Sequence, residues 1–329
     1  MPSYKSIQAS NALLSSIKSR FVAVFVGGTS GIGNATIKAL ATTGAEARIH
    51  VIGREASKDR MTAFIQELHS INSRAEVIWT GAEISLLSEV KRVCEGIMRQ
   101  ESRVDLLFMS AGYAPFGSRH ETAEGFEVTQ SLEYYSRILF IRLLMPLLCK
   151  SESPRVMSVL AGGLEPPSIS LDDMDLKHPS NFGGFKAQGH YAAMGTLALE
   201  RLGNEYEKVT FIHSFPGWVK TGNHLRGQEG KRNPIIHSVM ESFIGLMSFS
   251  EKESGQRHLF ESTSAMFGGQ GIAWDGESGV NSLGKHANGL FLVNEKCECT
   301  TNTKALPVLR ENAAESIWIH TQEVLRPYL

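Results

Sequence analysis

The chain has 329 residues, of which 42% are hydrophobic and 20% charged, a balance that supplies enough apolar side chain for a large core. Its formal net charge of −1 argues against a nucleic-acid partner or an anionic membrane surface, because both reward a cluster of positive charge. No apolar run approaches the roughly 20 residues of a membrane span, and residues 1–20 lack the apolar core of a signal peptide, so we expect a cytoplasmic protein. The four cysteines predict no disulfide framework, and the pair Cys297 and Cys299 lacks the further ligands of a closed zinc site, so we expect no metal.

Strand and helix patterns alternate along most of the chain. Residues 21–26 are continuously apolar, as in a strand that is buried on both faces of a parallel sheet. A glycine-rich turn follows, and apolar residues then recur at helical spacing over 32–43. This alternation predicts a Rossmann-type α/β fold of three layers, in which helices cover both faces of a doubly wound parallel sheet. The later predicted strands are 47–52, 75–79, 104–109, 155–160, 209–215 and 289–293, and the later helices are 61–68, 87–97, 138–148, 191–202 and 313–325.

Two stretches interrupt the alternation. Residues 162–189 form a polar insertion with prolines and glycines, and residues 222–263 have the pattern of a loop with short helices. We find no repeat and no linker, so we predict that 1–329 is a single domain with a dinucleotide-binding core at 21–221. Residues 222–263 are the predicted substrate lid, and 285–329 supply a C-terminal strand and helix. Apolar side chains in the lid indicate either a fairly large apolar substrate or a small core of the lid itself.

The turn at residues 27–33 has the sequence GGTSGIG and lies between a buried strand and an amphipathic helix. A pyrophosphate site needs glycine here, because the turn is tight, the backbone approaches the anion closely and the helix points free N–H groups at it. The hydroxyls of Thr29 and Ser30 are expected to add phosphate contacts. The second strand ends at Gly53 and Arg54, where a carboxylate would hold the ribose of NAD(H). An arginine instead suits a 2′-phosphate, so we predict NADP(H).

Three ordered motifs resemble the short-chain dehydrogenase/reductase family: GGTSGIG at 27–33, SAG at 110–112 and PGWVKT at 216–221. The likeness covers about 21–221, and the whole chain looks most similar to a divergent fungal branch often found in secondary-metabolite pathways. Family members are commonly dimers or tetramers, so the resemblance allows a homo-oligomer without fixing one. It implies that NADPH is the cofactor and that Glu83 and Ile84 hold its adenine. The cofactor-binding residues it implies are Gly27, Thr29, Ser30, Gly31, Ile32, Gly33, Arg54, Glu83, Ile84, Ser110, Ala111, Gly112, Pro216, Gly217, Val219 and Thr221.

The family's catalytic Asn, Ser, Tyr and Lys do not carry over directly. Leu160 and Ala161 stand where the family has serines, and Glu133 stands about where its Asn belongs. Tyr191 begins the run YAAMG, so the lysine of the Y-x-x-x-K pattern is replaced by Gly195.

The register of the tyrosine motif is open. Counting back from Pro216 without gaps puts the tyrosine and lysine positions at Lys186 and His190, and one deletion moves them to Ala187 and Tyr191. These alternatives differ by about one helical turn and share one helix face. We therefore expect His190 or Tyr191 to face the nicotinamide, with a protonated His190 as one candidate acid.

The motifs together predict an NADPH-dependent reductase of a ketone, imine or activated alkene. Its substrate is expected to be a mid-sized apolar molecule of natural-product type. Two alternatives stay open. The loss of the serine and lysine positions also fits a redox-neutral isomerase or cyclase, and a non-catalytic NADPH-binding protein would need neither residue.

Overall fold

Eight strands form one sheet, in the order β3-β2-β1-β4-β5-β6-β7-β8, in a computed structural model that describes residues 2–115, 117–217 and 249–329. All neighbouring strands are parallel except β7 and β8. The predicted Rossmann-type doubly wound sheet is thereby confirmed. The strands are β1 (Phe21–Val26), β2 (Ala47–Gly53), β3 (Ala75–Gly81), β4 (Leu106–Met109), β5 (Arg155–Val159), β6 (Thr210–Ser214), β7 (Leu290–Val293) and β8 (Cys299–Thr300).

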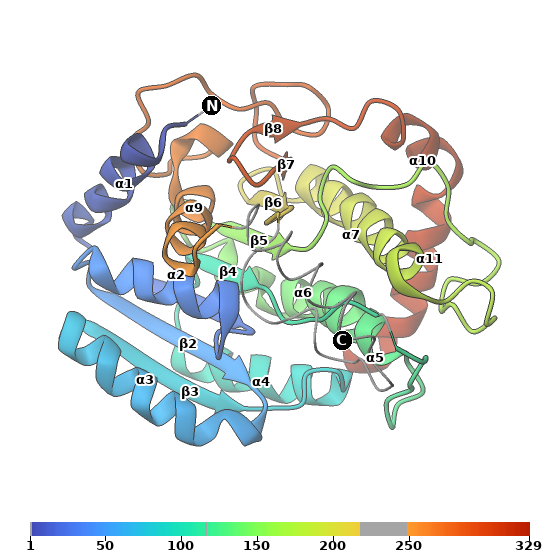
Figure 1. The fold of residues 1–329 in the computed structure, drawn as a ribbon, viewed down its shortest axis with the longest axis horizontal. Coiled ribbons are helices and arrows are strands. Elements are labelled where there is room, and N and C mark those ends of the chain that lie inside the picture. Colours follow the sequence, from blue (N-terminus) through green and yellow to red (C-terminus); the bar gives the residue numbers. More distant parts are fainter. Residues whose placement is uncertain (1, 116, 218–248) are drawn as a thin grey trace, which may run out of the picture.

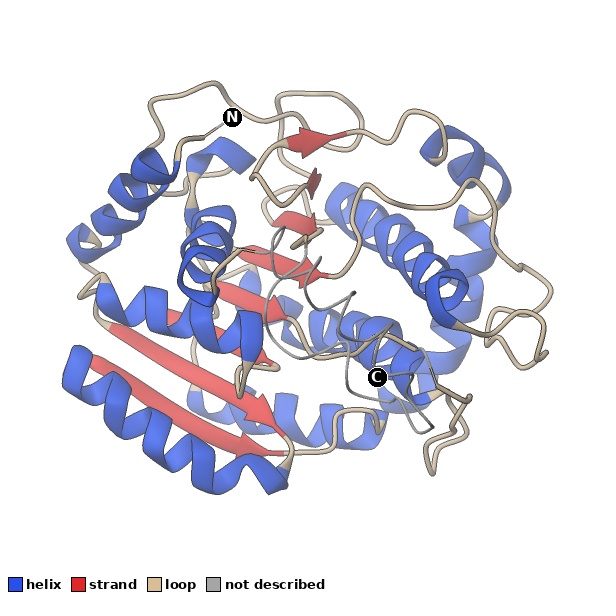
Figure 2. Ribbon diagram, viewed as in Figure 1, coloured by secondary structure: helices blue, strands red, loops and turns tan. Residues whose placement is uncertain are grey.

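The alternation of side chains along the strands supplies two separate cores. In β1, Val22, Val24 and Val26 point to one face of the sheet, and Ala23 and Phe25 point to the other. Helices α1, α2, α3 and α9 cover the second face, whereas α4, α6, α7, α10 and α11 cover the first (Figures 1 and 2). The helices are α1 (Tyr4–Ala12), α2 (Gly31–Thr42), α3 (Lys58–Ile71), α4 (Leu87–Gln100), α5 (Val128–Gln130), α6 (Ser136–Leu148), α7 (Gly184–Glu205), α9 (Glu251–Thr263), α10 (Leu306–Asn312) and α11 (Ala314–Leu325).

The strand order reverses direction at β1. The chain runs outward from β1 to β2 and β3, and then returns to place β4 on the other side of β1. In a sheet of this kind, ligands bind outside the carboxyl ends of the strands at such a switch point. The turn after β1 and the loop after β4 therefore meet where the sequence predicts the cofactor.

The predicted lid boundary is wrong at its C-terminal end. Residues 251–263 form α9, which packs against α2 and β5 as part of a helical layer. Leu259 and Phe260 are fully buried there, so this segment belongs to the core and not to a mobile cover. Residues 222–248 of the predicted lid, and the predicted contacts Val219 and Thr221, lie outside the described residues.

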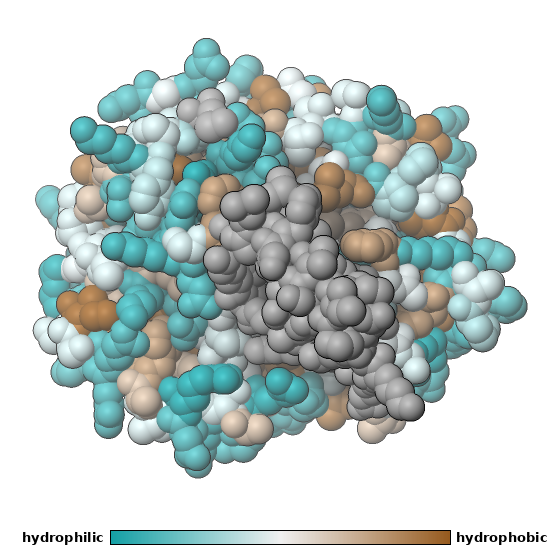
Figure 3. Space-filling view, in the orientation of Figure 1, coloured by the Kyte–Doolittle hydropathy of each residue, from teal (hydrophilic) through white to brown (hydrophobic). Residues whose placement is uncertain are grey.

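The polar N-terminus also has a structure that its composition did not predict. Helix α1 begins after Ser3, whose hydroxyl accepts a hydrogen bond from the Ser6 backbone N–H at 3.1 Å. It packs on α9, where Asn11 Nδ2 donates to the Gln256 carbonyl at 2.8 Å. Among the described residues, none of the helices has the length and apolarity that crossing a bilayer requires. Figure 3 shows apolar residues scattered among hydrophilic ones on the described part of one face.

A buried arginine ties β5 to the segment that follows α9. The Arg155 side chain is about 1% exposed, and its guanidinium donates to the carbonyls of Phe267 and Gly268 at 3.3 and 2.5 Å. Burial lowers the pKa of Arg155 to about 10, so it remains a cation at neutral pH. Within the described parts of the chain it has no carboxylate partner, and the carbonyls alone balance its charge.

We expect Arg155→Ala to lower the free energy of unfolding by about 2–4 kcal/mol, because it leaves two buried carbonyls without donors and opens a cavity. Arg20→Ala is the matched control. Arg20 pairs with Glu46 and Glu76, but its side chain is 43% exposed, so the loss should stay below about 1 kcal/mol. Urea denaturation measures both variants, and equal losses would contradict the role given to Arg155.

Candidate functional site

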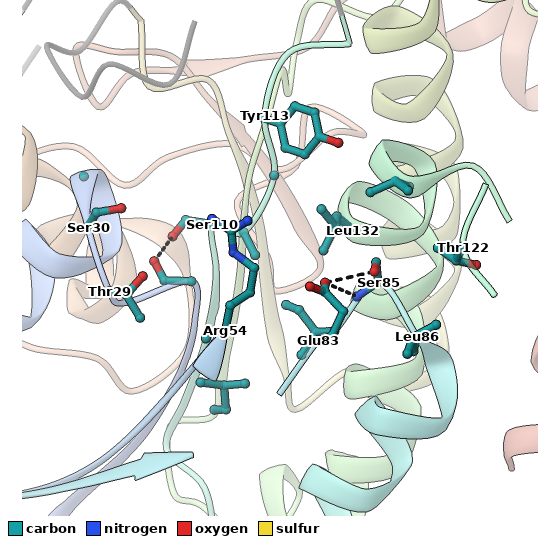
Figure 4. Close-up of a pocket in the computed structure, with 18 of the residues that line it drawn as sticks. Thr29, Ser30, Arg54, Glu83, Ser85, Leu86, Ser110, Tyr113, Thr122 and Leu132 are labelled. Carbon is teal, nitrogen blue, oxygen red and sulfur yellow. Dashed lines mark hydrogen bonds between the residues drawn. The ribbon is translucent and has the colours of Figure 1, made fainter. Parts of the chain in front are cut away.

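A cavity of about 780 Å³ lies at the carboxyl ends of β1, β2, β3 and β4 (Figure 4). Its walls come from the turns and loops that follow these strands and from the start of α2. Most of the predicted cofactor-binding residues meet in this cavity. The predicted residues that line it are Gly27, Thr29, Ser30, Gly31, Ile32, Arg54, Glu83, Ile84, Ser110, Ala111 and Gly112.

The phosphate turn has no room for a side chain at Gly27 or Gly33. Gly27 has a φ of +98°, and a Cβ there would lie 2.5 Å from the Ala111 backbone nitrogen. A Cβ on Gly33 would lie 2.7 Å from the Gly27 carbonyl oxygen and 2.9 Å from Ser110 Oγ. The turn, the first coil of α2 and the loop after β4 are thus in direct backbone contact. Helix α2 begins at Gly31, so its first N–H groups open toward the cavity, as an anion site requires.

Strand β2 ends at Gly53, which Arg54 follows, and the predicted preference for NADP(H) rests on these two residues. A Cβ on Gly53 would lie 2.4 Å from Thr29 Cγ2, so a carboxylate side chain would fit there only if the Thr29 side chain moved. Arg54 is exposed and extends along the cavity wall (Figure 4). Its side chain makes no hydrogen bond or ion pair with the rest of the described chain. After β3, Glu83 Oε1 accepts a hydrogen bond from Ser85 Oγ at 2.9 Å.

Tyr191 belongs to α7 and is fully buried against the segment before α5. Its hydroxyl donates to Glu127 Oε2 at 3.0 Å and lies 3.5 Å from Thr129 Oγ1. Burial and the neighbouring Glu127 carboxylate raise the pKa of Tyr191 well above its usual value. The phenol therefore holds its proton firmly. Tyr191 is not among the cavity-lining residues, and its predicted contact with the nicotinamide stays a prediction.

His190 is also buried on α7. Its Nε2 lies 3.0 Å from the Met174 carbonyl oxygen, and burial lowers the pKa of His190 to about 4. The imidazole is consequently neutral near pH 7. The protonated form that a general acid would need is therefore scarce at that pH. Gly195, one turn further on, is half-buried, and a Cβ there would make an ordinary 3.8 Å contact with His213 Cε1.

Glu133 lies closer to the cavity than the other two predicted catalytic residues, because it abuts a residue that lines it. It belongs to one turn of π-helix, η3 (Ser131–Tyr135), an irregularity that recurs at functional sites. Its Oε1 lies 2.4 Å from where a Cβ of Gly112 would be, and Gln188 Nε2 donates to its Oε2 at 2.9 Å. Burial raises the pKa of Glu133 to about 8, against the lowering effects of Arg137 and Gln188.

Two site residues were missed in the sequence. Tyr113 lines the cavity directly after the SAG motif, which was a usable signal. Arg137 is buried one helical turn after Glu133 and donates to the Ala111 carbonyl, Ser158 Oγ and the Val159 carbonyl at 2.8, 2.8 and 2.9 Å. An arginine directly before the apolar stretch 138–148 was the signal for this link between the ends of β4 and β5.

The π-helix is fastened to the C-terminal helix on its far side. The Tyr134 hydroxyl lies 2.5 Å from Thr321 Oγ1, and the Tyr135 hydroxyl lies 2.7 Å from His320 Nε2. Tyr135 also donates to Asp175 Oδ1 at 2.6 Å. The predicted contacts Pro216 and Gly217 follow β6 and are not among the residues that line the cavity. A Cβ on Gly217 would lie 2.8 Å from Glu295 Cβ.

Comparison with known proteins agrees with this geometry. Residues 21–166 match the short chain dehydrogenase family. The chain is 35% identical to an oxidoreductase of Emericella nidulans, over 99% of this chain and 98% of that protein. It is 30% identical to a short-chain dehydrogenase/reductase of Stachybotrys chartarum, over 99% of this chain and 97% of that one.

The chain belongs to the short-chain dehydrogenase/reductase family. This short-chain dehydrogenase/reductase is an oxidoreductase, and its family binds a nicotinamide cofactor. Both relatives are fungal proteins, which confirms the predicted resemblance to a fungal branch of the family. A solved structure, the NADPH-dependent 3-quinuclidinone reductase of Rhodotorula rubra, shares the fold with a TM-score of 0.54 and 19% identity, over 76% of this chain and 86% of that one.

We expect Gly27→Ala to abolish nicotinamide-nucleotide binding and to destabilise the protein by several kcal/mol, because its Cβ would overlap the Ala111 backbone at an unfavourable φ. Gly96→Ala is the control, since a Cβ on Gly96 within α4 meets nothing within 4 Å. That change should preserve binding and leave stability equal or slightly higher. Equilibrium dialysis and thermal unfolding test both, and nucleotide binding by Gly27→Ala would refute the tight-turn assignment.

Proposed function

We propose that this short-chain dehydrogenase/reductase is an NADPH-dependent reductase of a ketone, imine or activated alkene in a mid-sized apolar substrate. The observation that carries the proposal is the cavity at the switch point, where a tight glycine turn and the start of α2 meet the exposed Arg54. The names of its relatives, which are oxidoreductases, favour hydride transfer over a redox-neutral isomerase or cyclase and over a non-catalytic protein.

The preference for NADPH rests on the end of β2. Gly53 supplies no carboxylate to accept hydrogen bonds from the ribose hydroxyls of NADH, and packing against Thr29 keeps it small. The guanidinium of Arg54 is exposed beside the cavity and is not used by other described residues. A 2′-phosphate would satisfy its donors and its charge together.

The cofactor supplies the hydride when it is bound, and the chain supplies position and charge. The residues that stand where the family has serine and lysine, Leu160, Ala161 and Gly195, have no side-chain donor. In this proposal Tyr191 and His190 support the site from within α7, and Glu133 abuts the cavity lining at Gly112. Hydride transfer then depends mainly on alignment of the two reactants.

The apolar substrate is supported by side chains near the carboxyl edge of β5 and the start of α7. Leu164, in the loop that follows β5, is a large apolar side chain that is 57% exposed. Leu160 packs beside Tyr191 in a small apolar cluster with Leu176 and Ala187. A substrate with an extended apolar surface would cover these groups.

We expect Arg54→Asp to weaken NADPH binding by about 10- to 100-fold, the value of a charge-assisted contact of about 1.5–3 kcal/mol, and to spare NADH. Arg99→Asp makes the same charge change on an exposed residue at the end of α4, away from the cavity, and should leave both affinities unchanged. Fluorescence titration with both nucleotides measures the effect. An unchanged NADPH affinity in Arg54→Asp would show that Arg54 does not contact the phosphate.

The reductase activity is tested with NADPH deuterated at the hydride position and a panel of apolar ketones, imines and enones. We expect deuterium in the reduced product and one equivalent of oxidised cofactor for each turnover. Turnover of a substrate without cofactor oxidation would favour the isomerase alternative, and tight cofactor binding without turnover would favour a binding protein.

A further inference from the structure

Glu133 is a buried carboxylate surrounded by nitrogen donors. The residue is 4% exposed, and its Oε2 accepts a hydrogen bond from Gln188 Nε2 at 2.9 Å. The backbone N–H of Tyr113 also donates to the carboxylate. Its other oxygen lies against the Cα of Gly112, on the backbone that lines the cavity. These donors suit an ionised carboxylate, because a protonated one would need an acceptor for its own hydrogen.

The charge of this carboxylate has no partner within the described residues. Arg137 lies one turn away, but its guanidinium donates to the carbonyls of Ala111 and Val159 and to Ser158 Oγ. Burying an unpaired carboxylate is costly, and the group usually takes up a proton instead. Burial accordingly raises the pKa of Glu133 to about 8, so it is mostly neutral at pH 7 until a cation arrives. The hydrogen-bond donors around Glu133 thus suit its ionised form, but without a nearby cation burial keeps the carboxyl group mostly protonated at pH 7.

We infer that Glu133 is the buried counter-charge of the oxidised, cationic nicotinamide ring, and that it makes the reduced cofactor a better hydride donor. The inference rests on the proposed function, because it takes Ser110–Gly112 to line the ribose next to that ring. When a hydride leaves with the electron pair of its C–H bond, the neutral ring becomes a cation. A carboxylate beneath Gly112 stabilises that cation through the low-dielectric interior without touching it. Glu133 is therefore a positioning residue that acts through its field.

The other charged and titratable groups near Glu133 come from four elements. Tyr113 follows β4, Glu127 precedes α5, Arg137 begins α6, and Tyr191 belongs to α7. Arg137 stays cationic between pH 6 and 9, since burial lowers its pKa only to about 10. The phenols of Tyr113 and Tyr191 stay neutral over that range, because burial and the carboxylates raise their pKa values. Glu127 is the second carboxylate and is tested separately below.

The decisive quantity is the ratio of the dissociation constants of NADP⁺ and NADPH, measured by calorimetry on the full chain between pH 6.5 and 9. Titration of the shared 2′-phosphate affects both nucleotides and cancels in this ratio. Binding of the cation favours the ionised form of Glu133 and expels a proton, so affinity for NADP⁺ should rise with pH. The ratio should fall by up to about tenfold from pH 7 to pH 9, as expected for a group with a pKa near 8.

In Glu133→Gln we expect a ratio that does not change with pH and that stays near the value of the native protein at low pH. Glu133→Asp keeps a carboxylate and should keep a pH slope, which a merely structural role would not predict. Glu127→Gln should retain the native slope. Glu83→Gln, at the adenosine end of the cavity, should change both dissociation constants by one common factor.

A ratio that is flat with pH in the native protein, or a slope that persists in a folded Glu133→Gln variant, overturns the inference and leaves the proposed function intact. If the native protein binds neither nucleotide, the proposed function itself fails. If Glu133→Gln does not fold, the slopes of the native protein and of Glu133→Asp decide the matter.

Discussion

Three stretches of backbone, the turn after β1, the start of α2 and the loop after β4, approach one another so closely that Gly27 and Gly33 have no room for a Cβ. The contacts at Gly27 and Gly33 fix where the positive end of α2 points and how deep the cavity floor lies. The same junction forms one wall of the cavity that Arg54, Glu83 and Gly112 also line.

A second constraint holds the part of the cavity where chemistry is expected. Arg137 joins the carboxyl ends of β4 and β5 by donating to Ala111, Ser158 and Val159. This is an unusual use of a buried cation, since carbonyls and a hydroxyl, and not a carboxylate, satisfy its donors. The result is a rigid floor beneath Gly112 that leaves Glu133 beside a positive charge without pairing with it.

The sequence was informative where a local pattern determines the structure. Continuous apolar runs identified the parallel strands, and the glycine turn identified the cavity, because both depend on neighbours within a few residues. It was uninformative where partners lie far apart in the chain. The hydrogen bond from Tyr191 to Glu127 spans 64 residues, and the polar insertion before α7 made the register of that helix ambiguous. Helix α9 was assigned to the lid for the same reason, since its apolar face packs on α2, which is distant in sequence.

The bonds from Tyr134 to Thr321 and from Tyr135 to His320 make the last helix part of the frame around Glu133. In sequence, these partners are separated by more than half of the chain, so the π-helix cannot acquire its final supports early in synthesis. The strands and helices of the first half can assemble while later residues are still on the ribosome. The contacts that support the π-helix become complete only after residues 320 and 321 have been synthesised.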